Sequence, residues 1–406
     1  MNVVFLSPNY PPEMQQYTRG LAEVGARVLG VGDTPVSGLA PVVRRSLVDY
    51  LQVPRMLDEE DVIRRVHHWL RGRSVDRVLA NWEVLVMTAA RLRERFGMEG
   101  MDPDTVRGFR DKQVMKERVR AAGLRTARSR RVRTVAEVEA AVAEIGYPLI
   151  LKPIDGAGSA NTWRLDGPAD LPPVLRAMRS VPEASCEEFI TGEEFTYDTL
   201  CVGGRPVFEN VAQYLPPALV ARTREELSPI IITVRDMDAP KYGDGVALGR
   251  SVLGALGMGD GFTHMEWFRT GSGEAIFGEI GCRPGGANLV DQMNWSCDID
   301  LFREWARVAC FGSFAASAER RYNCAIIFKR ARGQGRITRI EGLRSFLADH
   351  GKHVVADQLL RPGSMRRNWK NTLLSDGFLA VRHPDWDTTR RIAEEAAERV
   401  VLHAGG

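Results

Sequence analysis

The sequence has few of the features that mark secreted, membrane and zinc-binding proteins. Only six of its 406 residues are cysteine, and none forms a Cys-x-x-Cys pair, so the spacing indicates neither a zinc site nor a disulfide framework. Residues 1–7 lack a basic start and a long apolar run, so they do not resemble a signal peptide. No apolar stretch approaches the length of a membrane span. We therefore expect a soluble, cytoplasmic protein with reduced thiols and no membrane partner.

The chain also lacks a surplus of either charge. It has 55 Lys and Arg residues against 52 Asp and Glu residues, a formal net charge of +3. A dedicated nucleic-acid binder would show a concentrated basic face, whereas the Arg-rich segment 125–133 is interrupted by apolar residues. We expect no nucleic-acid partner. The hydrophobic content of 44% is ordinary for a globular protein, and the length predicts two or three domains.

The first strand-like run is not followed by G-x-G-x-x-G, so a dinucleotide site is not supported. Strand-like runs at 3–6, 27–31 and 76–80 alternate with helix-like segments, which predicts an open α/β sheet in the N-terminal part. Beyond residue 320 the pattern returns to strands, and a final helix is predicted over 387–402.

Two glutamates in the segment 263–280 stand out. Glu266 and Glu279 lie thirteen positions apart, in strand-like runs joined by the turn sequence 270–273. If the hairpin is symmetric about that turn, His264 lies opposite Glu279, with Glu266 one step along on the same face. Two facing carboxylates need a cation between them or a proton on one of them, and hard oxygen ligands suit Mg²⁺. The alternative is a surface hairpin with two solvated glutamates.

A lysine ends the aliphatic strand-like run 147–152 and is followed by a turn of small residues. Lys152 needs an anion nearby if it is buried. In Asp155-Gly-Ala-Gly-Ser159 the glycines let backbone N–H groups approach an anion, and Ser159 adds a hydroxyl. This combination fits a polyphosphate. The alternative is a lysine whose ammonium reaches water before a flexible turn.

Two further motifs are weaker when taken alone. The segment 186–198 alternates acidic and apolar residues; its backbone could read an adenine edge, and Glu194 could accept hydrogen bonds from ribose hydroxyls, or it could be two strands with a polar edge. Arg283 follows Glu279 by four residues and could clamp a phosphate or carboxylate, or it could be a surface arginine in a Gly/Pro turn.

The order and spacing of these motifs resemble the ATP-grasp superfamily over roughly residues 100–315. The most specific pieces are Gly-Tyr-Pro-Leu-Ile-Leu-Lys-Pro, Glu-Glu-Phe-Ile-Thr-Gly-Glu-Glu-Phe, and His-Met-Glu followed by Gly-Glu-Ile-Gly-Cys-Arg-Pro-Gly-Gly. The resemblance implies an α/β (α+β) ATP-grasp fold. We expect an N-terminal Rossmann-like domain over 1–100, a core over 101–315 with a small subdomain at about 112–190, and a β-rich C-terminal lid region over 316–406.

The resemblance also implies roles for the nucleotide-binding residues. Lys112 is similar to the first nucleotide lysine, near the α-phosphate, and Lys152 to the second, at the α- and β-phosphates. The flap over the phosphates would comprise Asp155, Gly156, Gly158 and Ser159. The adenine-reading hinge would comprise Glu187, Glu188, Phe189 and Ile190, with Glu194 as the ribose carboxylate.

The remaining implied roles concern chemistry. Glu266 and Glu279 are similar to the Mg²⁺ ligands, and Arg283 to the arginine that holds the acyl-phosphate and the tetrahedral species. His264 lies beside the metal face as a further catalytic candidate. One departure is visible, because many members have Glu-Ile-Asn-Pro-Arg, with the asparagine as a third metal ligand. Here Gly281 stands at that position and has no side chain to offer; we expect the following Cys282 to be a packed residue rather than a catalytic one.

The implied activity is that of a carboxylate–amine ligase that uses ATP with Mg²⁺, which Mn²⁺ can replace. A small-molecule carboxylate would be activated as an acyl-phosphate and attacked by an amine, with release of ADP and phosphate. The alternatives are the same nucleotide site with another acceptor, such as bicarbonate or formate, and a non-catalytic ATP sensor. A homodimer is compatible with the class, although no residue indicates one.

Overall fold

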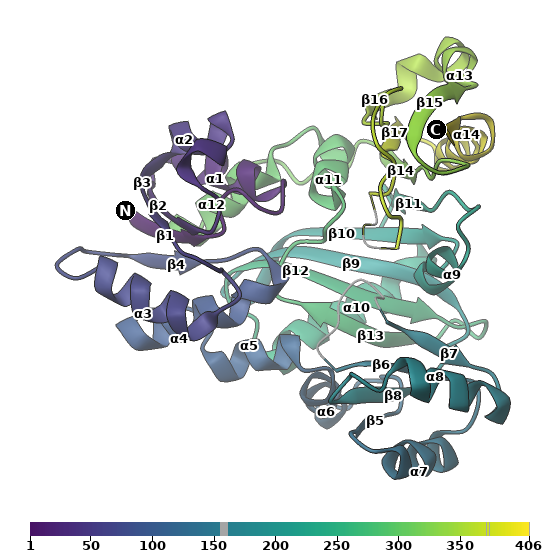
Figure 1. Cartoon of the computed structure of the whole chain (residues 1–406), viewed down its shortest axis with the longest axis horizontal. Coiled ribbons are helices and arrows are strands. Elements are labelled where there is room, and N and C mark those ends of the chain that lie inside the picture. Colours follow the sequence, from purple (N-terminus) through teal and green to yellow (C-terminus); the bar gives the residue numbers. More distant parts are fainter. Residues whose placement is uncertain (155–160, 371, 373, 406) are drawn as a thin grey trace.

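The computed structural model describes residues 1–154, 161–370, 372 and 374–405, which form four β-sheets (Figure 1). The largest sheet, of eight strands, lies in the middle of the molecule. The N-terminal unit, a small unit and the C-terminal unit are arranged around it (Figure 1). None of the helices in the described ranges combines the length and the apolar character that a membrane span requires.

The N-terminal unit is an open α/β sheet, as predicted. Its four strands run parallel in the order β3-β2-β1-β4, with helices between them. The elements are β1 (Asn2–Leu6), α1 (Met14–Glu23), β2 (Arg27–Gly32), α2 (Pro41–Ser46), β3 (Leu47–Gln52), α3 (Glu59–Trp69), β4 (Arg77–Leu79) and α4 (Val86–Phe96). The sequence did not predict β3, whose side chains are mostly half-buried and show no clear alternation. A short 3-10 turn, η2 (Glu83–Leu85), follows β4 and carries Glu83 toward the central sheet.

The small unit is an antiparallel sheet covered by helices. Its strand order is β5-β8-β6-β7. The elements are α5 (Pro103–Arg110), α6 (Lys112–Ala121), β5 (Ser129–Val132), α7 (Val135–Ile145), β6 (Leu149–Pro153), β7 (Trp163–Leu165), α8 (Leu171–Ala177) and β8 (Ala184–Glu188). In the β6–β8 register, Lys152 lies opposite Ser185 and Ile150 opposite Glu187, so Lys152 and Glu187 are diagonal neighbours on one face.

The central sheet is antiparallel throughout, in the order β13-β12-β9-β10-β11-β14-β17-β16. Its strands and associated helices are β9 (Glu193–Val202), β10 (Arg205–Leu215), α9 (Ala218–Thr223), β11 (Ile230–Thr233), α10 (Pro240–Leu256), β12 (Gly261–Arg269), β13 (Ala275–Gly281), α11 (Leu289–Cys297), α12 (Leu301–Phe311), β14 (Asn323–Phe328), β16 (Val354–Asp357) and β17 (Phe378–His383). Three strands from the C-terminal region, β14, β16 and β17, therefore extend the sheet that carries the site.

The end of the chain differs from the predicted helix over 387–402. Helix α14 (Trp386–Arg399) stops earlier, and β18 (Val401–Gly405) pairs with β15 (Arg336–Glu341), while α13 (Leu343–His350) packs nearby. The predicted helix is too long because the last residues form backbone hydrogen bonds with β15, a strand distant in sequence.

The β12–β13 hairpin has a different register from the symmetric one predicted. The turn places Thr270 opposite Glu274, and a bulge at Gly278 adds one more residue to β13. Glu266 therefore pairs with Glu279, and His264 pairs with Gly281 rather than with Glu279. The two one-residue shifts add up to an even number, so the residues predicted to share a face still share it.

Helix α10 covers the face of the central sheet opposite the glutamates, and two of its glycines make this contact close. A Cβ at Gly245 would lie 2.2 Å from the Trp267 ring, and one at Gly249 would lie 2.2 Å from the Tyr197 ring. The two rings belong to the core cluster between α10 and the sheet. The helix can approach the sheet this closely only because both positions lack a side chain.

We predict that Gly245→Ala destabilises the protein by about 1–3 kcal/mol, because the added methyl overlaps a fully buried ring. The matched control is Gly254→Ala on the exposed side of the same helix, where no atom lies within 4 Å. It should leave stability unchanged or raise it by up to about 1 kcal/mol. Thermal unfolding followed by circular dichroism distinguishes the two. Equal shifts in apparent Tm for both variants would contradict the close packing.

Candidate active site

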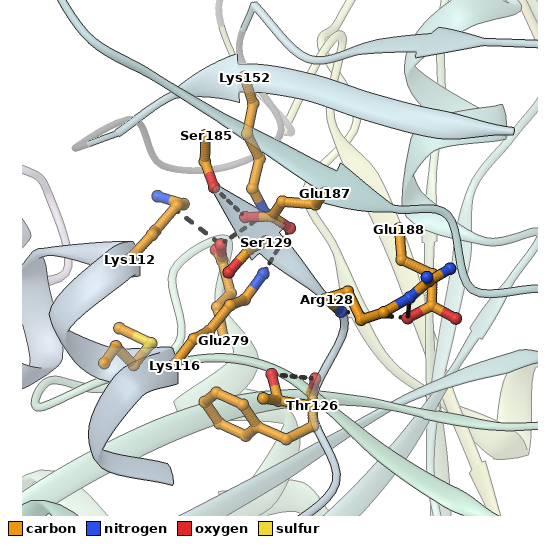
Figure 2. Close-up of polar contacts among 12 residues, drawn as sticks. Lys112, Lys116, Thr126, Arg128, Ser129, Lys152, Ser185, Glu187, Glu188 and Glu279 are labelled. Atoms are coloured by element: carbon orange, nitrogen blue, oxygen red, sulfur yellow. Dashed lines mark hydrogen bonds and ion pairs between the residues drawn. The ribbon is translucent and has the colours of Figure 1, made fainter. Parts of the chain in front are cut away.

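A cluster of lysines and glutamates joins the small unit to the central sheet (Figure 2). Lys152 Nζ lies 3.0 Å from Glu187 Oε2 and 3.4 Å from Glu279 Oε2. Lys112 Nζ lies 3.7 Å from the same oxygen of Glu279. The structure thus brings together four residues that the sequence assigned to the nucleotide and metal sites, from α6, β6, β8 and β13.

A fifth member, Lys116, was not predicted. It lies one turn after Lys112 on α6, is fully buried, and places Nζ 2.5 Å from Glu187 Oε2. The spacing of four residues puts both lysines on one face of the helix, which is the only local signal of their shared role. Nothing in the sequence indicates that this face is buried.

The charges in the cluster shift each other's pKa values. Burial raises the pKa of Glu279, but the Lys112 and Lys152 ammonium groups outweigh it and bring the pKa to about 2. Burial likewise raises the pKa of Glu187, and Lys116 and Lys152 outweigh it, holding the pKa well below its usual range. Both carboxylates are therefore ionised at neutral pH, and Lys152 stays protonated between them because they raise its pKa against the effect of burial.

The residues predicted to form the hinge, 187–190, line a cavity of about 470 Å³ next to this cluster. Its walls come from the small unit, the segment 187–192, α9 and the β12–β13 hairpin of the central sheet. The apolar side chains include Ala127, Ile150, Ile190, Leu219, Val220 and Phe268. Asp155, Gly156, Gly158 and Ser159, predicted to form the flap, lie outside the described residues.

The predicted hinge and ribose residues differ in where their side chains point. Glu188 turns toward Arg125 and Arg128 and accepts hydrogen bonds from both (Figure 2 shows the Arg128 contact). The Phe189 ring lies under the Arg164 guanidinium, 4.1 Å from its centre. Glu194 lines the cavity and accepts a hydrogen bond of 2.7 Å from Ala218 N, at the start of α9. Burial, and then the Glu266 charge, raises the pKa of Glu194 to about 8.

Glu266 and Glu279 form a cross-strand pair with their carboxylates at the cavity. Burial, and then the Glu279 charge, raises the pKa of Glu266, which is the effect expected of one buried carboxylate facing another. The donor set fits Mg²⁺, which takes one or two carboxylates and leaves its other positions to water and phosphate. In the described ranges, no group of three or more His, Cys, Asp or Glu side chains is arranged as a metal site.

Arg283 is held by a residue that the sequence did not indicate. Its guanidinium forms an ion pair with Glu83, which also pairs with Arg110. Burial raises the pKa of Glu83, but the two arginines outweigh it and lower the pKa. A Cβ at Gly281 would lie 3.1 Å from Glu83 Oε2, so the glycine leaves room for this carboxylate.

His264 is oriented by a buried aspartate. Its Nδ1 lies 2.5 Å from Asp198 Oδ1, and the two residues are cross-strand partners on β12 and β9. Asp198 Oδ2 accepts hydrogen bonds from Thr196 Oγ1 at 2.8 Å and from Asn210 Nδ2 at 3.2 Å. His264 Nε2 then points toward Glu266, with 3.9 Å between Nε2 and Oε1. The sequence placed His264 near the metal face but did not identify Asp198.

A second, small cavity of about 20 Å³ adjoins the first, lined by Glu83, Arg110, Lys112, His264, Glu266, Glu279 and Arg283 among others. Lys112, Glu266 and Glu279 line both cavities. The cluster therefore stands where a large, partly apolar cavity meets a small, charged one.

The chain is similar in sequence to two curated proteins that are named as ligases. It is 29% identical over 243 residues to the L-arginine-specific L-amino acid ligase of Bacillus subtilis, a match that covers 58% of each chain. It is 27% identical over 278 residues to an alanine–anticapsin ligase of Bacillus subtilis, which covers 63% of this chain and 58% of that protein. The match thus spans less than two thirds of the length of these relatives. No family model matches the chain.

Solved structures resemble the whole chain. An L-amino acid ligase from Bacillus licheniformis matches with a TM-score of 0.78 at 19% identity, covering 100% of this chain and 99% of that one. An N5-carboxyaminoimidazole ribonucleotide synthetase from Thermotoga maritima matches with a TM-score of 0.73 at 18% identity, with the same coverage. At such identities the likeness concerns the fold, which is the one that the sequence motifs predicted. The whole-chain fold similarity and the partial sequence similarity to amino-acid ligases agree with the resemblance to the ATP-grasp superfamily that the sequence motifs indicated.

Proposed function

We propose that this protein is an ATP-dependent ligase that joins a small-molecule carboxylate to an amine. The observation that carries the proposal is the meeting of the two cavities at Lys112, Glu266 and Glu279. A nucleotide in the large cavity would direct its terminal phosphate toward the small one. An acceptor carboxylate beside Arg283 would then lie at the transferred phosphoryl group.

The reaction has two steps. A carboxylate oxygen attacks the γ-phosphorus, the bond to the β,γ-bridging oxygen breaks, and ADP leaves. The amine nitrogen then attacks the carbonyl carbon of the acyl-phosphate, the bond from that carbon to the phosphate oxygen breaks, and the amine loses a proton. Phosphoryl transfer of this kind depends on positioning and charge stabilisation more than on covalent chemistry by the protein.

The charged residues supply that positioning. Lys112 and Lys152 would hold the phosphate oxygens, and Glu266 and Glu279 would hold Mg²⁺, which neutralises phosphate charge when bound. Arg283 would stabilise the negative charge that develops on the acyl oxygen, held in place by Glu83. His264, fixed by Asp198, also lines the small cavity, where it would face the reacting carboxylate.

The names of the similar proteins suggest which substrates to test first. Protein, MgATP and a panel of amino acids that begins with L-arginine and L-alanine are incubated together, and nucleotide and phosphate products are measured. ADP and phosphate formation that requires both a carboxylate and an amine supports the ligase. ATP binding without turnover across a broad panel supports the alternative of a sensor, and AMP with pyrophosphate contradicts the acyl-phosphate route.

We predict that Glu279→Gln lowers kcat by on the order of a hundredfold or more, because the variant loses a metal-binding carboxylate at the phosphate end. The fold should survive, since the amide is isosteric. Turnover is followed by ADP release, and circular dichroism checks the fold. A kcat equal to that of the wild type would exclude Glu279 as a metal ligand.

Arg283→Ala should spare nucleotide binding but block product formation. The reason is that Arg283 lines the small cavity and not the large one. Calorimetric titration with ATP measures the first effect, and product mass spectrometry the second. If ATP affinity is lost while kcat stays normal, Arg283 acts on the nucleotide instead of the acyl group.

The charge pattern of the cluster also predicts a pH dependence of stability. The pKa of Glu187 in the folded protein is lowered from its ordinary value of 4.5, so its charge stabilises the fold above that pH. This contribution is lost as the pH falls from 4.5 toward the lowered pKa of the folded protein, because over that range the unfolded chain takes up a proton at Glu187 while the folded protein does not. Glu187→Gln should therefore lower the apparent Tm most near neutral pH.

The gap in Tm between Glu187→Gln and the wild type should shrink as the pH is lowered through the acid range. The control is Glu144→Gln, which removes an exposed ion pair with Arg130 and should shift Tm little at any pH. A gap for Glu187→Gln that stays constant down to acid unfolding would show that the charge of Glu187 is not what stabilises the cluster.

A further inference from the structure

Lys116 is unusual because a lysine with no exposed surface is costly unless its charge is matched. Its exposed fraction is 0%, and its ammonium lies 2.5 Å from Glu187 Oε2. Burial lowers its pKa to about 8, against the opposing effect of Glu187. Lys116 is not among the residues that line either cavity, so its ammonium does not reach a ligand there.

The partner of Lys116 is shared with Lys152. Glu187 Oε2 forms ion pairs with both lysines, at 2.5 Å from Lys116 Nζ and 3.0 Å from Lys152 Nζ (Figure 2). The other oxygen, Oε1, accepts a hydrogen bond of 2.8 Å from Ser185 Oγ. Both carboxylate oxygens of Glu187 therefore have partners, which fixes the orientation of this side chain on β8. Glu187 in turn holds the Lys152 ammonium from one side.

Two lysines of α6 balance the charges of the two carboxylates beside Lys152. Lys152 lies between two carboxylates, Glu187 at 3.0 Å and Glu279 at 3.4 Å. Each of these has a second lysine of its own, Lys116 for Glu187 and Lys112 for Glu279, and the two are one turn apart on α6. Three ammonium groups thus face the two carboxylates Glu187 and Glu279 within this cluster.

We propose that Lys116 is a positioning residue for Lys152 in ATP binding. It takes up the charge of Glu187, so that Glu187 can orient Lys152 without cancelling its attraction for phosphate. Without Lys116, the two carboxylates beside Lys152 would face two lysines, and Lys152 would be held toward Glu187. The proposal rests on the proposed ATP site, and it concerns the phosphates and not the base.

The test compares ATP with adenosine, which lacks the phosphates. Lys116→Met should weaken ATP binding by about tenfold, the effect of losing roughly one screened charge interaction, and leave adenosine binding within about twofold of the wild type. The control is Arg118→Met on the same helix, which removes an exposed ion pair with Asp104 and should change neither affinity. Calorimetric titration measures both ligands, and circular dichroism confirms folding.

A double-substituted protein tests whether the effect passes through Glu187. In the Glu187→Gln background, where no charge remains for Lys116 to balance, adding Lys116→Met should leave ATP affinity unchanged within about twofold. This pair of variants also tests the idea if Lys116→Met alone fails to fold, because the double variant removes both buried charges together.

Three results would overturn the inference. They are an ATP affinity of Lys116→Met equal to that of the wild type, a parallel loss of adenosine and ATP binding, and an undiminished effect in the Glu187→Gln background. These outcomes leave the proposed function standing, provided that the wild type binds ATP. A wild type that binds adenosine but not ATP would instead exclude the polyphosphate site, and with it both proposals.

Discussion

The ion pairs of Lys152 with Glu187 and Glu279 are the contact on which the rest of the site depends. Glu187 belongs to the small unit and Glu279 to the central sheet, so one ammonium group connects two separately built sheets. Helix α6 adds a lysine to each carboxylate from the side. Because buried charges are stable only when paired, the same contacts that neutralise the cluster also fix how the two sheets meet. The large cavity lies where the two sheets meet.

The geometry of the central sheet then decides which residues face that cavity. Along β9 and β12, even-numbered residues lie on the face of the glutamates and odd-numbered ones pack against α10. Glu266, His264 and Asp198 are all even-numbered and share this face: His264 is paired with Asp198, and Glu266 lies two residues along β12, paired with Thr196. The bulge at Gly278 brings Glu279 directly opposite Glu266. Helix α10 packs closely on the other face of the same strands, so the apolar packing on one face supports the polar residues on the other.

The sequence predicted the parts of the site that are local and missed those that depend on distant contacts. The hairpin could be read because turn residues and alternation are local, and its exact register could not, since a bulge leaves no strong mark in the pattern. Asp198 stands in a predicted strand, but its role appears only when that strand lies between β12 and β10. Glu83 is 200 positions from Arg283, and no spacing rule connects them. Lys116 looks like a surface lysine until β8 covers it.

Gly281, at the position where the resemblance implies a third metal ligand, lies beside the ion pair of Glu83 with Arg283. A Cβ at position 281 would lie 3.1 Å from Glu83 Oε2, which is tighter than an ordinary van der Waals contact, so the carboxylate between its two arginines would have to shift by a few tenths of an ångström. Glu83 comes from the N-terminal unit, so this contact ties that unit to the arginine expected to act on the acyl group. A side chain at position 281 and the Glu83 carboxylate would crowd each other. This chain has the ion pair of Glu83 with Arg283 and no side chain at position 281. A metal ion here would therefore bind to two carboxylates, with phosphate oxygens and water completing its coordination.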